Sequence, residues 1–313
     1  MASVVAITGG TGFMGSYATL LFESLGHRVY PVDLLPPSHD LSLLPIKVKN
    51  NRLDVTDSRA FGKLCKSKKV THIVHLAHPR GEEEPDVLHR SHQAMTSVLE
   101  AAKNIGVERV VFASSASIYG LNKKRGRSLA REDDPVGMEP VFLHRTSKIM
   151  GEWLGAFYAQ QYGLNFVALR FSSVYGPGQS GGLGTAIKEG IMGRECEPSL
   201  SRDPDDPIFV KDAVQALRLA CFSDQIRSRV YNIGCGKSYV ESDLERAMQR
   251  HMPEVSFAVQ KPPVSKTIED LPHSNILDVS LARDELGFVP QFDLETGVGA
   301  IASWARNEKR RLK

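Results

Sequence analysis

The stretch FLHRTSKIM (142–150) puts a histidine four residues before a lysine in a segment that reads as a helix. Residues four apart share one face of a helix, so His144 and Lys148 are expected to point the same way, with Ser147 close by. Imidazole titrates near neutral pH, and a neighbouring ammonium lowers its pKa by like-charge repulsion. A neutral His144 can then accept a proton. The same pattern also fits an ordinary helix surface, or a site whose chemistry has changed.

A glycine loop is the second feature whose spacing can support chemistry. The stretch TGGTGFMG (8–15) follows the apolar run VVAIT and precedes a helical segment. Its glycines Gly9, Gly12 and Gly15 permit a tight turn and a close approach of the backbone to a pyrophosphate at the helix N-terminus. Asp33 ends the second apolar run, where a carboxylate can accept a hydrogen bond from a ribose hydroxyl. No arginine follows at once, so the pattern favours NAD over NADP.

The elements that must position these residues alternate between short β-rich runs and amphipathic helical stretches. We expect strands at 4–8, 27–33, 50–55, 71–77, 108–115 and 165–171, and helices from the glycine loop to about residue 25, at 87–105 and at 140–163. Such alternation builds parallel βαβ units, so the predicted fold is α/β, a doubly wound parallel (Rossmann) sheet. Ser115 falls at the carboxyl end of a strand, the edge at which such sheets bind ligands.

The strand–helix pattern loosens after residue 171. A Gly- and Pro-rich stretch precedes a short helix expected near 185–193, and strand–helix pairs follow at 207–222 and 230–248. The sequence therefore predicts an NAD-binding Rossmann domain over 1–171. Residues 172–313 are expected to form a smaller C-terminal lobe that mainly binds substrate and is interleaved with the sheet.

Composition argues against two classes of partner. The net charge of +3 is mild and spread along the chain, which does not indicate binding to nucleic acid. The first residues lack the charged region of a signal peptide, and no apolar run reaches membrane-spanning length. We therefore expect a cytoplasmic protein that does not associate with membranes.

The cysteines and histidines do not indicate a metal site. The four cysteines form no CxxC motif and suit reduced thiols: Cys65, Cys196, Cys221 and Cys235. Four histidines show no HExxH pattern, so structural or surface roles are expected for His75, His78, His89 and His92.

Several motifs in the right order carry a resemblance to a known family. The matching stretches are TGGTGFMG (8–15), Asp33, LDV (53–55), HLAH (75–78), VVFASSASIYG (110–120), LRFSSVYGPG (169–178), IFVKDAVQAL (208–217) and YNIGCGKSY (231–239). The chain resembles the extended short-chain dehydrogenase/reductases, the NAD-dependent epimerase/dehydratase family, along nearly its whole length. The resemblance implies NAD as cofactor, held by Gly9, Gly12, Phe13, Met14, Gly15, Asp33, Leu34, Asp54, Val55, Leu76, Ala77, Lys148, Ser173 and Val174.

The family's catalytic set is a Ser or Thr after the fifth strand and a Tyr-x-x-x-Lys motif on a helix. Ser115 and Lys148 match this set, and the resemblance implies that the Lys148 ammonium binds the nicotinamide ribose. His144 stands at the tyrosine position; it is shorter than tyrosine, so a substrate would sit deeper or be reached through water. Three alternatives stay open. The site uses His144, or Ser115 with water; the protein binds NAD without turnover; or the pocket has an unrelated use.

A further departure from the family bears on the substrate. Members that act on nucleotide sugars carry an Arg-Asp pair just before the segment matching PIFVKD, and this chain has Asp205-Asp206 there. At a second phosphate-binding position only Lys266 is present. Carboxylates repel a diphosphate, and one lysine does not replace the bidentate fork of an arginine. A nucleotide sugar is therefore less favoured than in the family as a whole.

The leading hypothesis is an enzyme that uses NAD for transient or net oxidation of a secondary alcohol. Its substrate would be a sugar-like or polyhydroxylated small molecule, with Ser115, His144 and Lys148 as an altered catalytic triad, in a dehydrogenase, epimerase or dehydratase. The alternative is a non-catalytic NAD-binding sensor or scaffold. By resemblance alone, we expect a homodimer that pairs through the helices at about 87–105 and 141–161.

Overall fold

The structure is a computed structural model and describes residues 2–37, 50–79, 85–120, 129–136, 143–200, 204–257 and 276–311. Within these ranges the strands are β1 (Val4–Thr8), β2 (Arg28–Asp33), β3 (Asn51–Arg52), β4 (His72–His75), β5 (Arg109–Ser115), β6 (Phe166–Phe171), β7 (Val174–Tyr175), β8 (Ile208–Phe209) and β9 (Val230–Ile233). The helices are α1 (Phe13–Ser24), α3 (Ser58–Lys68), α4 (Pro85–Ile105), α5 (Leu143–Tyr162), α6 (Gly182–Met192), α7 (Val210–Phe222), α8 (Glu241–His251), α9 (Ser280–Leu286) and α10 (Leu294–Arg311), with a 3₁₀ turn, η1, at Ala116–Tyr119. No helix in the described ranges is long and apolar enough to cross a membrane.

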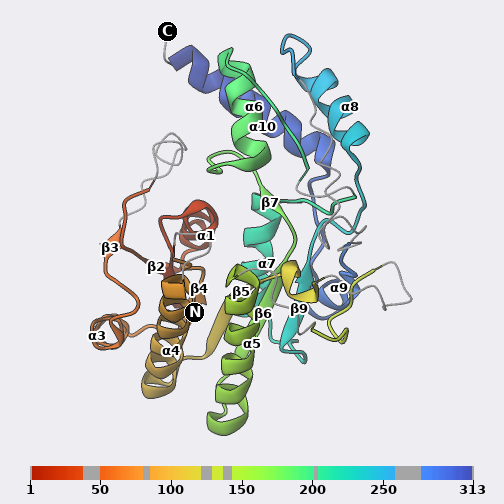
Figure 1. The fold of residues 1–313 in the computed structure, drawn as a ribbon. Helices are drawn as coiled ribbons and strands as arrows, with labels where there is room; N and C mark the ends of the chain where they lie inside the picture. Colours follow the sequence, from red (N-terminus) through yellow and green to blue (C-terminus); the bar gives the residue numbers. More distant parts are fainter. Residues whose placement is uncertain are drawn as a thin grey trace.

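Seven of the described strands form one parallel sheet in the order β3-β2-β1-β4-β5-β6-β9. The chain first builds outward from β1 to β3 and then crosses back to β4 on the other side of β1. Open α/β sheets bind ligands at the carboxyl ends of the strands next to such a reversal. The doubly wound Rossmann sheet predicted from the sequence is confirmed (Figure 1).

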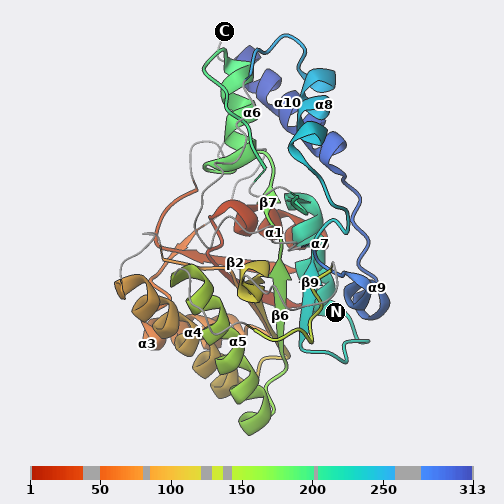
Figure 2. The ribbon, with the colours of Figure 1, turned by 45° about the vertical axis from the view of Figure 1, so that its right-hand side comes forward.

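Helices cover both faces of this sheet. Val5 and Ile7 of β1 face a core shared with α1 and α7, whereas Val4 and Ala6 face a core shared with α3, α4 and α5. Successive strand residues point to opposite faces, so an unbroken apolar run is what a strand covered on both faces needs. The helices α3, α4 and α5 lie side by side in both views of the ribbon (Figures 1 and 2).

The chain after residue 171 contributes both to the sheet and to a second cluster of helices. β9 pairs with β6 in the main sheet, while β7 and β8 pair only with each other among the described strands. The helices α6, α8 and α10 gather at one end of the molecule around their own apolar core, which includes Ile187, Leu244 and Ile301 (Figure 2).

The observed elements differ from the expected ones in a few places. The strand expected at 50–55 is reduced to β3, because Asp54 accepts hydrogen bonds from the N–H (2.9 Å) and hydroxyl (2.8 Å) of Thr56 and turns the chain toward α3. The helix expected near 185–193 begins earlier, at Gly182. The strand in the 207–222 segment, β8, does not join the main sheet. Residues 140–142 of the helix expected at 140–163 lie outside the described residues.

A buried ion pair joins α5 to the sheet. Arg170 of β6 donates to both carboxylate oxygens of Glu152 on α5, with Nε–Oε1 at 3.0 Å and Nη2–Oε2 at 2.8 Å. The two side chains are only 5% and 8% exposed. The Ser114 hydroxyl also donates to Glu152 (2.5 Å), and Arg170 donates to the hydroxyl of Tyr119 (2.9 Å). Losing either ion would leave the other charge buried and uncompensated, so the pair fixes α5 against β5 and β6.

Two glycines let α5 approach the sheet closely. A Cβ atom at Gly151 would lie 2.5 Å from the ring of Phe112, and one at Gly155 would lie 2.2 Å from the ring of Phe166. Both distances are shorter than a carbon–carbon contact allows. A larger residue at either position would therefore push α5, and the residues it carries, away from the sheet.

The close packing of α5 predicts opposite effects for two glycine substitutions. Gly155→Ala should lower the free energy of unfolding by about 1–3 kcal/mol through overpacking against Phe166. Gly62→Ala, in α3 with no atom within 4 Å of its added Cβ, should raise it by roughly 0.5–1 kcal/mol, since alanine is the better helix former. Urea unfolding followed by circular dichroism measures both. Equal changes of the same sign would contradict the described packing.

Candidate active site

A cleft of about 780 Å³ opens at the carboxyl ends of the parallel strands, within the usual range of roughly 300–1,000 Å³ for small-molecule sites. The loops after β1 to β4, the ends of β5 and β6, and residues of α4 and α5 line it. The predicted site residues found along it are Gly9, Gly12, Phe13, Met14, Gly15, Asp33, Leu34, Asp54, Val55, Leu76, Ala77, Ser115, His144, Lys148 and Val174. Ser173 is not among the lining residues; its hydroxyl donates to Asp205 (3.4 Å).

The glycine loop has the shape of an anion-binding turn. A Cβ atom at Gly15 would lie 2.1 Å from the Gly9 carbonyl oxygen, and Gly9, at φ +68°, lies against the backbone of Ala77. Gly12 is the N-cap of α1 and offers no side chain to accept hydrogen bonds from the first turn, which also holds no acidic residue. The amide groups and positive end of the helix dipole therefore face the cleft without a side-chain acceptor, and the turn fits a diphosphate.

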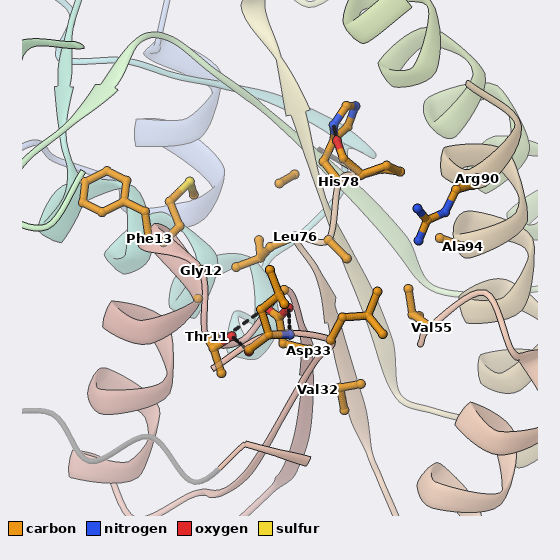
Figure 3. A pocket seen from close by; sticks show the side chains of 18 of the residues that line it. Thr11, Gly12, Phe13, Val32, Asp33, Val55, Leu76, His78, Arg90 and Ala94 are labelled. Carbon is orange, nitrogen blue, oxygen red and sulfur yellow. Dashed lines mark hydrogen bonds between the residues drawn. The ribbon is translucent and has the colours of Figure 1, made fainter. Parts of the chain in front are cut away.

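Asp33 closes β2 beside this turn. Its carboxylate accepts hydrogen bonds from the backbone N–H groups of Thr11 and Leu35, both at 3.3 Å. Figure 3 shows Asp33 in the cleft next to Thr11, with Phe13 on one side. The carboxylate thus holds the glycine loop, and its remaining lone pairs can accept from a ribose hydroxyl. The loop and Asp33 together fit a dinucleotide.

Arg90 is a cleft residue that was not identified from the sequence. It reaches the cleft from α4 beside Ala94, across from Phe13 (Figure 3). Its guanidinium lies 3.7 Å from the carboxylate of Asp54, and both side chains are 37% exposed. Because the Arg90 guanidinium is already paired with a carboxylate, it is less able to bind a ribose 2′-phosphate. This agrees with the preference for NAD over NADP that Asp33 predicts.

Ser115, at the end of β5, and Lys148, on α5, line the same cleft. Ser115 accepts a hydrogen bond from the N–H of Ser117 (3.1 Å) at the start of η1, so it caps this turn while also lining the cleft. The buried Lys148 ammonium donates to the carbonyl oxygen of Ala113 (2.7 Å). Burial lowers the Lys148 pKa to about 8, although the Glu152 carboxylate opposes the shift.

His144 is half-buried on the same face of α5 as Lys148. Burial, the Lys148 ammonium and the nearby His78 lower the His144 pKa to about 3. The direction agrees with the expectation from the sequence, but desolvation is the largest cause and Lys148 the second. His144 is therefore neutral at neutral pH and can accept a proton.

His78 lies against His144, although a structural or surface role was expected for it from the sequence. The two rings are 5.0 Å apart between centroids, and both line the cleft. Burial and Lys148 lower the His78 pKa to about 4, opposed by a hydrogen bond with the Pro79 carbonyl. The sequence could have indicated a place in the cleft for His78. HLAH (75–78) begins at the last residue of β4, at the same ligand-binding edge that Ser115 occupies on β5.

Asp205 and Asp206 turn into the protein. Asp206 accepts hydrogen bonds from the backbone N–H groups of Cys235 (2.8 Å) and Leu277 (3.1 Å), and burial raises its pKa to about 7. The buried Asp205 accepts from the Asp206 N–H (2.9 Å) and the Ser173 hydroxyl. These carboxyls hold three chain segments together. They therefore repel an anion in the cleft less than the sequence alone suggests.

Comparison with known proteins agrees with this geometry. A sequence model of the NAD dependent epimerase/dehydratase family matches residues 5–234. The chain is 27% identical to UDP-glucuronate 4-epimerase 4 of Arabidopsis thaliana in an alignment 344 positions long. The alignment covers 96% of this chain and 74% of the relative. The structure of UDP-glucose 4-epimerase from Thermus thermophilus in complex with NAD matches with a TM-score of 0.80 and 26% identity, covering 97% of this chain and 99% of that chain.

A second solved structure supports the fold alone. UDP-glucose 4-epimerase of Thermotoga maritima, solved with UDP-glucose, matches with a TM-score of 0.83 and 24% identity, over 97% of this chain and 99% of that chain. The family match spans the glycine loop, β5 with Ser115, and α5 with Lys148. The chain belongs to the NAD dependent epimerase/dehydratase family and is an NAD-dependent enzyme of the extended short-chain dehydrogenase/reductase type.

Proposed function

We propose that this enzyme oxidises, transiently or in net, a secondary alcohol of a sugar-like or polyhydroxylated small molecule. The observation that carries the proposal is a single cleft lined by the glycine loop with Asp33 and also by Ser115, His144 and Lys148. The relatives described above are named for reactions of UDP-glucuronate and UDP-glucose, which supports a carbohydrate-like substrate. Membership of an enzyme family favours this proposal over a non-catalytic sensor or scaffold.

The cofactor contacts are proposed from the lining of the cleft and, for Ser173, from the resemblance to the family alone. The first turn of α1 would hold the diphosphate, Asp33 the adenosine ribose and Lys148 the nicotinamide ribose. NAD supplies the hydride acceptor when bound. The other residues proposed to contact it are Phe13, Met14, Leu34, Asp54, Val55, Leu76, Ala77, Ser173 and Val174.

His144 is the proposed acceptor of the substrate's hydroxyl proton. It is neutral at neutral pH, so a ring nitrogen can take that proton as the alcohol is oxidised. Ser115 accepts a hydrogen bond from Ser117, so its own O–H can donate to the substrate oxygen and orient it. The C-terminal lobe around α6, α8 and α10 would cover the substrate.

The environment of Asp205 and Asp206 bears on the substrate's charge. Their carboxyls are bound within the protein, and neither supplies the guanidinium that would pair with a diphosphate. Lys266 lies outside the described residues. In this proposal the substrate gains its affinity from hydroxyl groups, so a panel of sugars with and without a nucleotide separates the two substrate classes.

His144→Ala tests the proposed proton acceptor. It should lower kcat on the order of 10²-fold or more with little change in NAD affinity, because general acid–base catalysis contributes about that much. Lys148→Ala should weaken NAD binding as well. His89→Ala, at an exposed position of α4 outside the cleft, is the matched control.

The pH profile provides a second readout of the same prediction. Because the His144 pKa is lowered to about 3, kcat/KM should not fall as the pH drops through the range near 6.5 where an ordinary histidine titrates. Full turnover by His144→Ala would exclude His144 as the proton acceptor.

Asp33→Ala tests the cofactor preference. The wild-type protein should bind NAD more tightly than NADP, because the Asp33 carboxylate repels a 2′-phosphate, and the variant should lose most of this preference. Isothermal titration calorimetry with each nucleotide measures it, with Asp284→Asn, an exposed carboxylate of α9, as control. Equal affinities in the wild-type protein would contradict the role given to Asp33.

We also propose that two copies of the chain pair through α4 and α5. The support is an apolar patch on α5, where Trp153 is 62% exposed and Phe157, one turn later, is 50% exposed. Large exposed aromatic side chains one turn apart are typical of an interface. Packing α4 and α5 of two copies would form a four-helix interface that covers both rings.

Trp153→Glu should convert this dimer into a monomer, because it introduces a charge into the centre of the apolar interface. Multi-angle light scattering measures the mass in solution. Val289→Glu changes an equally exposed apolar residue (56%) in the loop between α9 and α10, and should leave the mass unchanged. A monomeric wild-type protein would rule out the pairing.

A further inference from the structure

Two imidazoles and one hydroxyl form a connected group beside Lys148. The ring of His78, from the loop after β4, is tilted by 56° against that of His144 on α5, with 5.0 Å between the centroids. Nε2 of His78 lies 3.1 Å from Oγ of Ser147. The Ser147 hydroxyl also lies 2.7 Å from the backbone carbonyl oxygen of His144. The group thus links the β4 loop to the first turns of α5.

The hydrogen-bonding capacities of this group fix where a proton can be added. Nδ1 of His78 lies 2.9 Å from the Pro79 carbonyl oxygen, which only accepts, so Nδ1 carries the ring's first proton. In the neutral ring, Nε2 is then an acceptor. The single Ser147 proton can go either to Nε2 or to the His144 carbonyl oxygen, and one of the two contacts lacks a hydrogen. When Nε2 is protonated, Nε2–H donates to Oγ of Ser147, and the Ser147 hydroxyl donates to the backbone carbonyl oxygen of His144. Both contacts are then hydrogen bonds.

We propose that His78 and His144 act as one proton-accepting pair. When Nε2 of His78 takes up the proton, the Ser147 hydroxyl rotates so that its oxygen accepts a hydrogen bond from Nε2–H. This inference rests on the proposed function, since the proton is the one that leaves the substrate hydroxyl. When bound, NAD would accept the hydride that leaves the substrate carbon, and the proton that leaves the hydroxyl oxygen would go to one of the two imidazoles. The pair gains one proton, and the reverse step returns it. Both rings line the cleft, so His78 is a second proton acceptor beside His144 in this scheme.

The charges around the pair limit it to one proton. The Lys148 ammonium acts on both rings from α5, the buried His75 on β4 is close enough to His78 to be affected by its charge, and Glu152 is held by Arg170. Burial and Lys148 disfavour a charge on either ring, and each ring disfavours a charge on the other. Two groups coupled in this way titrate in macroscopic steps that belong to the pair. A proton on Nε2 of His78 gives Ser147 two satisfied hydrogen bonds. This stabilisation compensates for the weak basicity of His144 alone.

Nuclear magnetic resonance of histidine Cε1, recorded against pH in the NAD-bound protein, tests the pair without any substrate. The signals of His78 and His144 should follow one shared first step, each with partial amplitude. In His78→Phe, which keeps an aromatic ring beside His144, the His144 signal should reach its full amplitude in a single step. Two rings that titrate independently in the wild-type protein would overturn the proposal.

Kinetics give a readout that a purely structural role would not produce. His78→Phe should lower kcat by about tenfold or more and should cost little further when combined with His144→Ala, because residues that act as a unit are not additive. His78→Asn retains a group that can hydrogen-bond to Ser147 but cannot take up a proton; it should keep the melting temperature and NAD affinity while losing the same kcat. His89→Phe is the control on α4. Full kcat in His78→Asn, or additive losses in the double variant, would overturn the pair.

The two measurements also separate this inference from the proposed function. Shared titration without turnover of any sugar-like alcohol would support the pair and contradict the proposed function. Turnover with independent titration would support the proposed function and contradict the pair.

Discussion

The Glu152 carboxylate accepts two hydrogen bonds from the Arg170 guanidinium at a place where both side chains are nearly closed off from solvent. His144, Lys148 and Glu152 are spaced four residues apart, so one stripe of α5 carries the proposed acid–base group, the ammonium proposed to bind the ribose, and the buried carboxylate. Because a buried ion pair is strongly destabilising to break, this stripe has one orientation toward the ends of β5 and β6. The glycines at 151 and 155 allow the close approach that the pair requires. The position of the candidate active site depends on this contact.

The same burial sets the charge state of the site. The negative charge of Glu152 offsets part of the desolvation of Lys148, whereas the imidazoles of His144 and His78 are held neutral. A tyrosine would need the ammonium to lower its pKa before it could act as a base at neutral pH. A histidine has the opposite problem: it is already deprotonated, and the ammonium makes it a weaker base. The proposed pairing of His144 with His78 addresses that weakness by giving the proton a second, hydrogen-bonded position.

Much of the fold could be predicted because local patterns determine it. Alternation of apolar runs and helical stretches requires parallel βαβ units, and the glycine loop after VVAIT identifies the first strand and the ligand-binding edge. The spacing of His144 and Lys148 likewise predicts one helical face. Contacts between distant segments could not be read in this way. His78 and His144 are brought together only by the packing of α5 on the sheet, and Asp206 is satisfied by amides that lie far from it in the chain. From the sequence alone, Asp205 and Asp206 were therefore expected to repel a diphosphate. In the structure their carboxylates accept hydrogen bonds within the protein.

The central claim is that hydride chemistry on an alcohol takes place in the cleft that holds His144. The most direct measurement is the absorbance of reduced nicotinamide after rapid mixing of the NAD-loaded enzyme with a panel of sugar-like alcohols, protonated or deuterated at the reacting carbon. We predict that reduced nicotinamide forms with at least one alcohol class and more slowly when that carbon carries deuterium. The absence of reduced nicotinamide with every alcohol, in a protein shown to bind NAD, would contradict the claim.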